Sequence, residues 1–463
     1  MASPIVRPCL IVAGVILVYV YIFADPVKCS WNQQFGNNYS SSYVDVPSIL
    51  PFDNGANQTF KNYYNPDYPS YDPAVSENGV LFLPLTETGV GVYVVAMNTT
   101  GEVLWNTAIN GPDTCGQSSN LVYSRRFGLV LVACGESYSN STPILYSIFA
   151  LSESNGEVKW SRQDLSVGKN SKLLALSDDM NILVYIAEGQ EQDKNSTCVI
   201  YLNLSNGTLA SSSNYSLCDV QWEGHMQTKV MYYVDDNNDL QEILITSSYQ
   251  ENAIIAFDLT SAQMLLWKIQ LPKNPTVYTN LFLSYASVED FEHTVFVIAS
   301  FVPWETNRKG GYYVLGLGTQ GEAKGSVLYN KTGYCDNTSA IISPPAVSND
   351  LIAFFSCGNQ VFAIHPYGGL IWKSEKLTAT YQAGVPPLPV SLSNSKGLLY
   401  VTVGPTTVAV LEMKSGTVVH SKFFELPDAA QIVHPPIVLG DVGLYVLYRT
   451  GQEDVSVLLW SGL

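Results

Sequence analysis

The side chains best suited to chemistry lie in one short polar stretch, residues 235–242, between two apolar runs. Asp235, Asn237, Asp239 and Glu242 supply carboxylate and amide oxygens at nearly alternate positions, and such oxygens are the ligands that Ca²⁺ prefers. We therefore expect a weak calcium site of the kind that extracellular modules carry. Leu240 stands where calcium loops need glycine for a sharp turn, so a polar hairpin loop without metal is the alternative.

The eight cysteines form the second group of reactive side chains. Three pairs are separated by 19, 20 and 22 residues, and the first and third pairs occupy the same place in their sequence repeats. Closing a loop of about 20 residues contributes roughly 3 kcal/mol in the chain-entropy view. Local disulfides are expected in preference to buried thiols, at Cys115–Cys134, Cys198–Cys218 and Cys335–Cys357. Cys9 lies in an apolar leader, and Cys29 remains as a candidate for an intermolecular disulfide.

The remaining reactive residues form no recognisable site. The five histidines are scattered, and no H-E-x-x-H metal motif, G-x-S-x-G elbow or Walker loop occurs in the sequence. No catalytic residue and no cofactor-binding residue is therefore predicted. Acidic residues outnumber basic ones by 40 to 23, and the net charge of −17 disfavours nucleic acids and anionic membranes as partners.

The chain repeats one unit several times, and these units must position any functional side chain. GEVLW at 101–105 returns as GEVKW at 156–160, and an alternating apolar run precedes each turn. Six of the seven aligned turns carry a glycine four residues before an anchor position, and in the fifth unit that glycine is Gly321. The anchors are Trp105, Trp160, Trp267 and Trp372, with Ser211, Gly325 and His420 in the other units. Alternation of period two between turn residues predicts strands and hairpins, so the expected fold is all-β.

The last unit is incomplete. It starts near Ile432 and holds three strands, with no room for a fourth before Leu463. An open sheet edge invites aggregation, so the N-terminal segment is expected to supply the missing strand. Eight units of about 55 residues each then account for the chain after the leader. We predict an eight-bladed β-propeller of four-stranded antiparallel blades over residues 71–463, whose last blade is closed by the N-terminal segment, residues 25–70.

Residues 1–24 are an expected signal peptide, because Arg7 precedes an uninterrupted apolar run from Cys9 to Ala24. The run is just shorter than a membrane span, so an uncleaved signal anchor is the alternative. Ten N-x-S/T sequons also favour the secretory pathway and predict glycosylation. They begin at Asn38, Asn57, Asn98, Asn140, Asn195, Asn203, Asn206, Asn214, Asn330 and Asn337.

The sequence resembles the pyrroloquinoline-quinone (PQQ) repeat propellers. The likeness rests on an apolar-x-A pattern followed by G-x-x-x-W, best seen in residues 94–105, 148–160 and 361–372, and on the opening phrase WNQQFGNNYS at 31–40. The resemblance implies that the four anchor tryptophans dock between neighbouring blades. Alcohol dehydrogenases of this family use PQQ, Ca²⁺, a catalytic Asp and a disulfide between adjacent cysteines, whereas this sequence has no Cys-Cys pair. PQQ is therefore not an expected cofactor, and the chain resembles the noncatalytic members.

These features predict a noncatalytic secreted or lumenal glycoprotein that serves as a binding scaffold or as a building block of an extracellular assembly. The expected partners are proteins or glycans, or a second copy joined through Cys29. The loop that carries Trp304, Arg308 and Lys309 is the candidate contact site, because binding residues concentrate in loops. The alternatives are a PQQ-dependent oxidoreductase and a type II membrane protein that keeps its leader as an anchor.

Overall fold

The computed structural model describes a series of segments that begins after the expected leader. They are residues 43–44, 57–60, 73–87, 91–109, 115–136, 145–166, 172–177, 181–188, 197–209, 228–234, 240–248, 253–258, 265–270, 277–278, 281–282, 294–303, 311–318, 325–335, 342–343, 345–348, 350–377, 390–426, 430–439, 443–450 and 454–461. Within these segments the chain forms strands and turns and no helix, which confirms the all-β prediction. None of the described residues thus belongs to a helix with the length and hydropathy that crossing a membrane requires.

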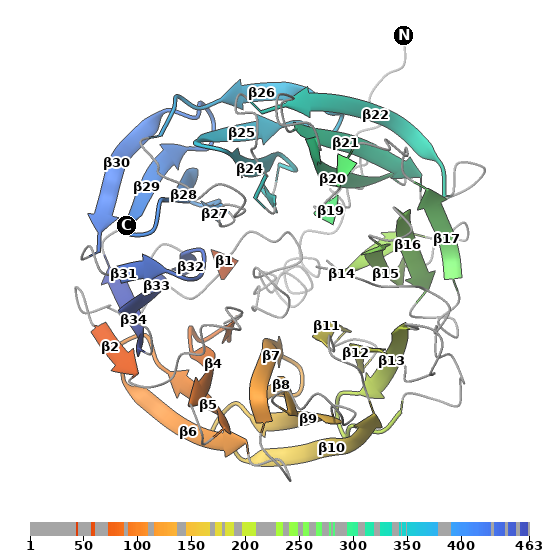
Figure 1. Ribbon diagram of the computed structural model, residues 1–463, viewed down its shortest axis with the longest axis vertical. Helices are drawn as coiled ribbons and strands as arrows, with labels where there is room; N and C mark the ends of the chain where they lie inside the picture. The colour runs from red at the N-terminus through yellow and green to blue at the C-terminus, as the bar shows by residue number, and fades with distance from the viewer. Residues whose placement is uncertain are drawn as a thin grey trace, which may run out of the picture.

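The described strands form eight sheets arranged around a common centre, as Figure 1 shows. We number the sheets first to eighth along the chain. Strands that follow one another in a sheet are antiparallel neighbours in most cases, and in the first seven sheets the last described strand lies at the outer edge (Figure 1). The first four sheets contain β3 (Ala74–Val75), β4 (Leu81–Glu87), β5 (Gly91–Met97) and β6 (Val103–Ile109); β7 (Cys115–Ser124), β8 (Leu129–Glu136), β9 (Leu145–Ser152) and β10 (Val158–Ser166); β11 (Lys172–Ser177), β12 (Ile182–Glu188) and β13 (Thr197–Asn203); and β14 (Thr228–Val234), β15 (Leu240–Ser248), β16 (Ala253–Asp258) and β17 (Leu265–Gln270).

The second half of the chain repeats this arrangement. The fifth to eighth sheets contain β18 (Val277–Tyr278), β19 (Leu281–Phe282), β20 (Thr294–Pro303), β21 (Gly311–Gly318) and β22 (Val327–Tyr334); β23 (Ala346–Val347), β24 (Ala353–Cys357), β25 (Gln360–Ile364) and β26 (Leu370–Lys373); β27 (Ser391–Ser393), β28 (Leu398–Val403), β29 (Thr407–Glu412) and β30 (Val418–Glu425); and β31 (Ala430–Ile432), β32 (Ile437–Leu439), β33 (Gly443–Thr450) and β34 (Asp454–Ser461).

The N-terminal and C-terminal parts of the chain meet in the eighth sheet. β2 (Asn57–Phe60) pairs antiparallel with β34, so that Asn57 lies opposite Leu458. β1 (Tyr43–Val44) pairs parallel with β32, with Tyr43 opposite Val438. The outer strand of this sheet therefore comes from the N-terminal segment.

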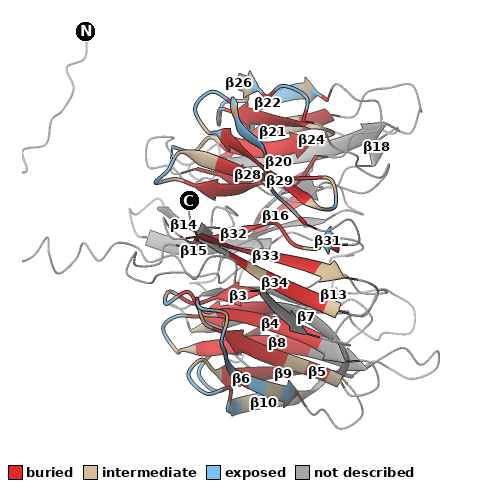
Figure 2. Cartoon of the chain, turned by 90° about the vertical axis from the view of Figure 1, so that its left-hand side faces the viewer, coloured by how far each residue is buried: buried red, intermediate tan, exposed pale blue. Residues whose placement is uncertain are grey.

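Alternating side chains of each strand fill the space between neighbouring sheets, because successive residues of a strand point to opposite faces. On β4, Leu81 and Leu83 belong to the core shared with the eighth sheet, whereas Phe82 belongs to the core shared with the second sheet. Figure 2 shows that the buried residues run through the middle of the strands, with exposed residues at the turns and outer edges. Among the described residues the hydrophobic core is thus divided into layers, which lie between six of the pairs of adjacent sheets.

A β-bulge recurs at the outer edge of six sheets. In the first sheet Trp105 is opposite Ala96 and Val103 is opposite Met97, so Leu104 falls outside the ladder. The same register shift skips Lys159, Leu266, Leu328, Ile371 and Val419. A bulge bends its strand and changes the direction of the neighbouring side chains. In five of the six sheets the residue after the bulge is a tryptophan or tyrosine that reaches the next sheet.

Candidate contact surface between the fifth and sixth sheets

Three anchor tryptophans reach across to a turn of the following sheet. The indole N–H of Trp105 donates a hydrogen bond to the Glu153 carbonyl at 2.8 Å. Trp160 donates to Leu204 at 2.7 Å, and Trp372 donates to Met413 at 2.9 Å. Each bond satisfies an indole donor that is at least half-buried and joins two successive repeats, so these residues hold the sheets together.

The turn glycines make room for these tryptophans. A Cβ added to Gly156 would lie 2.5 Å from the Trp105 ring, and one added to Gly207 would lie 2.5 Å from the Trp160 ring. Gly156 also has a φ of +69°, a conformation that residues with a side chain rarely adopt. The glycine and the tryptophan of one G-x-x-x-W pattern therefore take part in two different contacts. The glycine packs against the tryptophan of the preceding unit, and the tryptophan packs against the glycine of the following unit.

The fifth sheet departs from the sequence alignment. Gly325, which the alignment placed at the anchor, is the turn glycine in the structure, and a Cβ on it would lie 2.9 Å from the Trp267 Cβ. Tyr329 occupies the anchor position, and its hydroxyl donates a hydrogen bond to the Pro366 carbonyl of the sixth sheet. Its partner across the ladder is Gly316, where a side chain would collide with the ring. The true repeat in this unit is G-x-x-x-Y.

Of the other two anchors without tryptophan, only His420 lies within the described residues. His420, on the outer strand of the seventh sheet, is exposed and lies opposite Val410. The tryptophans instead lie opposite alanines: Ala96, Ala150, Ala256 and Ala363. The seventh sheet therefore pairs a larger residue with an exposed imidazole at the position where the other sheets pair alanine with tryptophan. Ser211 lies outside the described residues.

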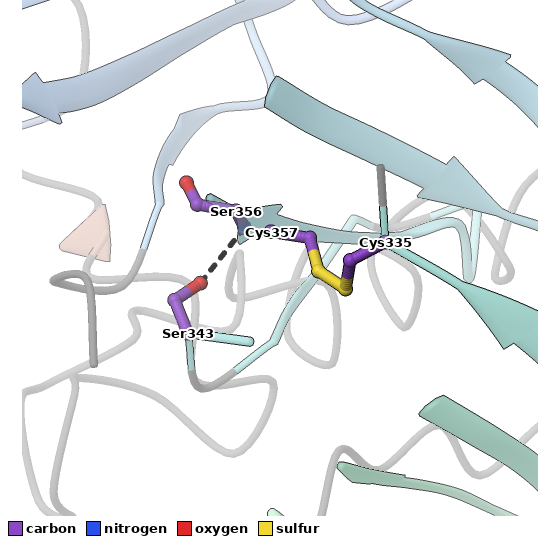
Figure 3. Close-up of a disulfide and its surroundings, with 4 residues drawn as sticks. All are labelled: Cys335, Ser343, Ser356 and Cys357. Atoms are coloured by element: carbon purple, nitrogen blue, oxygen red, sulfur yellow. Dashed lines mark hydrogen bonds between the residues drawn. A yellow bond between two sulfur atoms is a disulfide. The ribbon is translucent and has the colours of Figure 1, made fainter. Parts of the chain in front are cut away.

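One disulfide joins the fifth and sixth sheets, in agreement with the sequence prediction for this pair. Cys335 directly follows β22, and Cys357 is the last residue of β24, with 5.8 Å between their Cα atoms. Both residues are buried in the core that these two sheets share. Figure 3 shows the bond beside Ser343 and Ser356, where the Ser356 N–H donates to the Ser343 hydroxyl at 2.9 Å. The bond links the outer edge of one sheet to an inner strand of the next.

An exposed group of rings lies at this same junction, on the turn His365–Gly368. The His365 and Tyr367 rings stack at 5.4 Å, and Tyr367 lies 5.8 Å from the Tyr329 ring. Tyr367 is 54% exposed, whereas Tyr329 is half-buried. Burial, and to a lesser extent the neighbouring Tyr367, raises the pKa of Tyr329 to about 12. The Tyr367 N–H donates to His365 Nδ1 at 3.3 Å, which fixes the imidazole ring beside the turn.

Exposed aliphatic side chains and one lysine lie on the two outer strands that flank this turn, β22 and β26, and we name the whole group the Tyr367 surface. It consists of Leu328, Lys331, His365, Tyr367, Leu370 and Ile371, all exposed. Lys331 packs closely on Gly368, which makes β22 and the turn continuous. Residues 325–335 and 365–373 contain two lysines and no aspartate or glutamate, although the whole chain is strongly acidic. This surface was not predicted from the sequence. The absence of aspartate and glutamate from both segments, together with the H-P-Y-G turn, is the sequence signal that marks it.

Most of the other predicted site residues fall outside the described residues. These are Cys29 and Cys218, the calcium candidates Asp235, Asn237 and Asp239, the loop residues Trp304, Arg308 and Lys309, and the sequon residues Asn38, Asn140, Asn195, Asn214 and Asn337. Glu242 lies in β15, Cys198 in β13, and Cys115 and Cys134 on the neighbouring strands β7 and β8. Within the described segments no three His, Cys, Asp or Glu side chains come together as a metal site would require.

The comparison with protein families decides where the chain belongs. A model of the PQQ-repeat type, described as outer membrane protein assembly factor BamB, matches residues 55–297, which is just over half of the chain. The chain belongs to this family. Membership in the PQQ-repeat family confirms the resemblance seen in the sequence. A comparison with curated protein sequences finds no match.

Three solved structures are similar to this PQQ-repeat chain. BamB from Moraxella catarrhalis is 11% identical, with a TM-score of 0.49 over 87% of this chain and 97% of that chain. The C-terminal WD40 domain of Sif2 is 12% identical, with a TM-score of 0.52 over 90% of this chain and 99% of that chain. Sqt1 from Saccharomyces cerevisiae is 12% identical, with a TM-score of 0.54 over 88% and 98%. Because WD40 repeats form β-propellers, the likeness to the Sif2 domain shows the fold and nothing about function.

Proposed function

We propose that this chain is a noncatalytic glycoprotein of the secretory lumen or the cell exterior, and that its β-propeller is a scaffold for binding a protein. The observation that carries this proposal is the Tyr367 surface. Tyrosine and long aliphatic side chains exposed together mark a protein contact more than a glycan contact, because sugars gain little from leucine and isoleucine. The segments that form the surface carry lysines and no acid, so the partner is expected to present carboxylates there.

The architecture that we propose for this scaffold is a closed ring of eight four-stranded blades. Eight sheets surround the centre, and β2 adds an outer strand to the eighth. Such pairing supports closure by residues 25–70, since a closed ring leaves no blade without a neighbour. A rigid disc of this kind presents its turns and rim at fixed positions, which suits a binding role.

Three features support a secretory location. They are the apolar leader, the ten sequons and the Cys335–Cys357 disulfide, which forms and persists most readily in an oxidising compartment. Intact mass of the protein from its source, with and without glycosidase and reductant, tests this part of the proposal. We expect a chain that starts near Asp25 and carries N-glycans. A retained leader would instead support a membrane anchor, and extra mass equal to a quinone would support the oxidoreductase.

Binding through the Tyr367 surface is tested by photo-cross-linking. A photoreactive phenylalanine analogue replaces Tyr367 in one preparation and Leu265 in a control preparation, because Leu265 is similarly exposed, on the outer strand of the fourth sheet. We expect a defined acidic protein to be linked from position 367 and not from 265. With that protein purified, Tyr367→Ala should weaken binding by about ten-fold or more, as truncation of an aromatic anchor does. Equal cross-linking from both positions would reject the surface as the contact site.

A further inference from the structure

The outer strand of the fifth sheet is open along its whole length. β22 has eight residues, and every one of them is exposed or half-buried. By contrast, β6 in the first sheet buries Trp105 and Ile109 against the second sheet. β22 is also the last strand of its sheet among the described residues, so one row of its backbone groups has no neighbouring strand there. A long exposed edge of this kind is a template for pairing with another chain unless something blocks it.

Asn330 lies in the middle of this edge. Its neighbours Tyr329 and Lys331 contact the sixth sheet, through the Pro366 carbonyl and Gly368 respectively. Because side chains alternate along a strand, Asn330 points to the opposite face, where it is exposed. Asn330-Lys331-Thr332 is an N-x-T acceptor for N-linked glycosylation.

The amide nitrogen of Asn330 differs from those of two other sequons. Asn98 Nδ2 donates to the Glu102 carboxylate at 3.3 Å, and Asn203 Nδ2 donates to the Thr208 hydroxyl at 2.8 Å. A glycan on either nitrogen would take one of its two hydrogens and crowd a bond that closes a turn. A sugar on Asn330 would interrupt no such bond within the described part of the chain, so the fold accepts it at low cost.

We propose that Asn330 carries an N-linked glycan that guards the free edge of β22 against pairing with a second copy of the chain. In the transfer, Asn330 Nδ2 bonds to C1 of a lipid-linked oligosaccharide, the bond from C1 to the lipid diphosphate breaks with its electrons leaving on the diphosphate, and Nδ2 loses one proton. Lys331 and the bulge at Leu328 already disfavour pairing. A bulky hydrated glycan completes the block, because a second strand cannot approach through it.

The glycan and the Tyr367 surface do not compete for the same space. Tyr329 and Lys331 point toward the H-P-Y-G turn, whereas Asn330 points the other way. The same strand thus carries a guarded face and a contact face. The inference rests on the proposed secretory location, because the sugar is added only there.

The test combines glycopeptide mapping with sedimentation of the secreted protein. Asn330→Gln and Thr332→Val both destroy the acceptor, whereas Thr332→Ser keeps it and serves as the matched control. Asn206→Gln removes an exposed acceptor located in a turn and controls for the loss of any one glycan. We expect the first two variants to lose one glycan and to self-associate at an about ten-fold lower concentration, a shift of about 1.4 kcal/mol. Thr332→Ser and Asn206→Gln should remain monomeric.

The possible failures are distinguishable. An unmodified Asn330 beside a modified Asn206 would overturn this inference and leave the proposed function intact. Monomeric behaviour of Asn330→Gln would overturn the guarding role. Absence of glycan from every sequon would overturn the proposed secretory location itself. If a variant is not secreted, endoglycosidase trimming of the folded wild-type protein replaces it, and self-association after trimming is the expected result.

Discussion

The junction between the first and second sheets and the junction between the fifth and sixth are stabilised by different contacts. At the first, Trp105 is buried and bonded to Glu153, and the Thr107 hydroxyl donates to the Gly156 carbonyl at 2.9 Å. At the second, the smaller Tyr329 is only half-buried. A disulfide between Cys335 and Cys357 lies beneath it.

This difference shows that the anchor position of a repeat can lack tryptophan where another bond, here a disulfide, joins the two sheets. The tryptophan acts through buried area and one hydrogen bond, both of which require close approach of the sheets. The disulfide instead restricts the unfolded chain and requires no large ring at the rim. The rim between the fifth and sixth sheets is thereby free to expose Tyr367, which the first junction could not do without losing its own packing.

The largest expected effect on stability comes from the loss of an anchor tryptophan. Trp105→Ala should lower the free energy of unfolding by about 3–5 kcal/mol, because it opens a cavity between two sheets and leaves the Glu153 carbonyl without its donor. Leu104→Ala is the control, since this neighbouring residue is exposed on the bulge and should change stability by less than about 0.5 kcal/mol. Denaturant unfolding measures both. Similar losses would mean that the ring contributes no more than its exposed neighbour.

Removal of the disulfide should come next. Cys335→Ala combined with Cys357→Ala is expected to cost about 3 kcal/mol, as the bond closes a loop of 22 residues. Either single variant should lose nearly as much as the double variant, because each one alone breaks the bond. Thermal unfolding of the three proteins checks this. A double variant as stable as the wild type would show that Tyr329 alone holds this junction.

A methyl group at a turn glycine should have a smaller effect that depends on its surroundings. Gly156→Ala is expected to cost about 2–4 kcal/mol, which combines the strain of a positive φ with a collision against Trp105. Gly397→Ala shares the positive φ and has no atom within 4 Å of the added carbon, so it should cost only about 1 kcal/mol. Unfolding midpoints of the two variants separate the backbone strain from the collision with Trp105. Equal losses of stability in both variants would mean that the collision contributes nothing.

The smallest expected effect concerns the hydroxyl that replaces an indole. Tyr329→Phe should cost about 1 kcal/mol through loss of the bond to the Pro366 carbonyl. Because the pKa of Tyr329 is raised from 10.0 to about 12, the native state holds this proton more tightly than the unfolded state does. The hydroxyl's contribution is therefore complete below pH 10 and is lost as the pH rises toward 12.

Denaturant unfolding of wild type and Tyr329→Phe at about pH 9 and about pH 11 follows this loss. We expect the stability difference between the two proteins to shrink at the higher pH. A constant difference would mean that the hydroxyl stabilises the junction in some way other than by donating its proton.

The sequence predicted the strands and the repeat because both depend on local patterns. The alternation in residues 92–97 and the glycine four residues before Trp105 are each decided within a few positions. The fifth unit was misaligned because Gly321 and Gly325 both fit the turn pattern, and the choice depends on which one lies against Trp267 in the previous sheet. The Tyr367 surface was missed for the same reason, since it forms only where two outer strands meet.

The direction of the tryptophan contacts sets an order for biosynthesis. Each donor bonds to a turn that lies later in the chain, 41 to 48 residues on. A repeat that leaves the ribosome is therefore unfinished until the next one has been translated, and assembly can advance from unit to unit at the pace of elongation. β2 is the exception: its partner β34 lies seven sheets further along the chain, so the nascent chain must keep β2 unpaired until β34 has been translated.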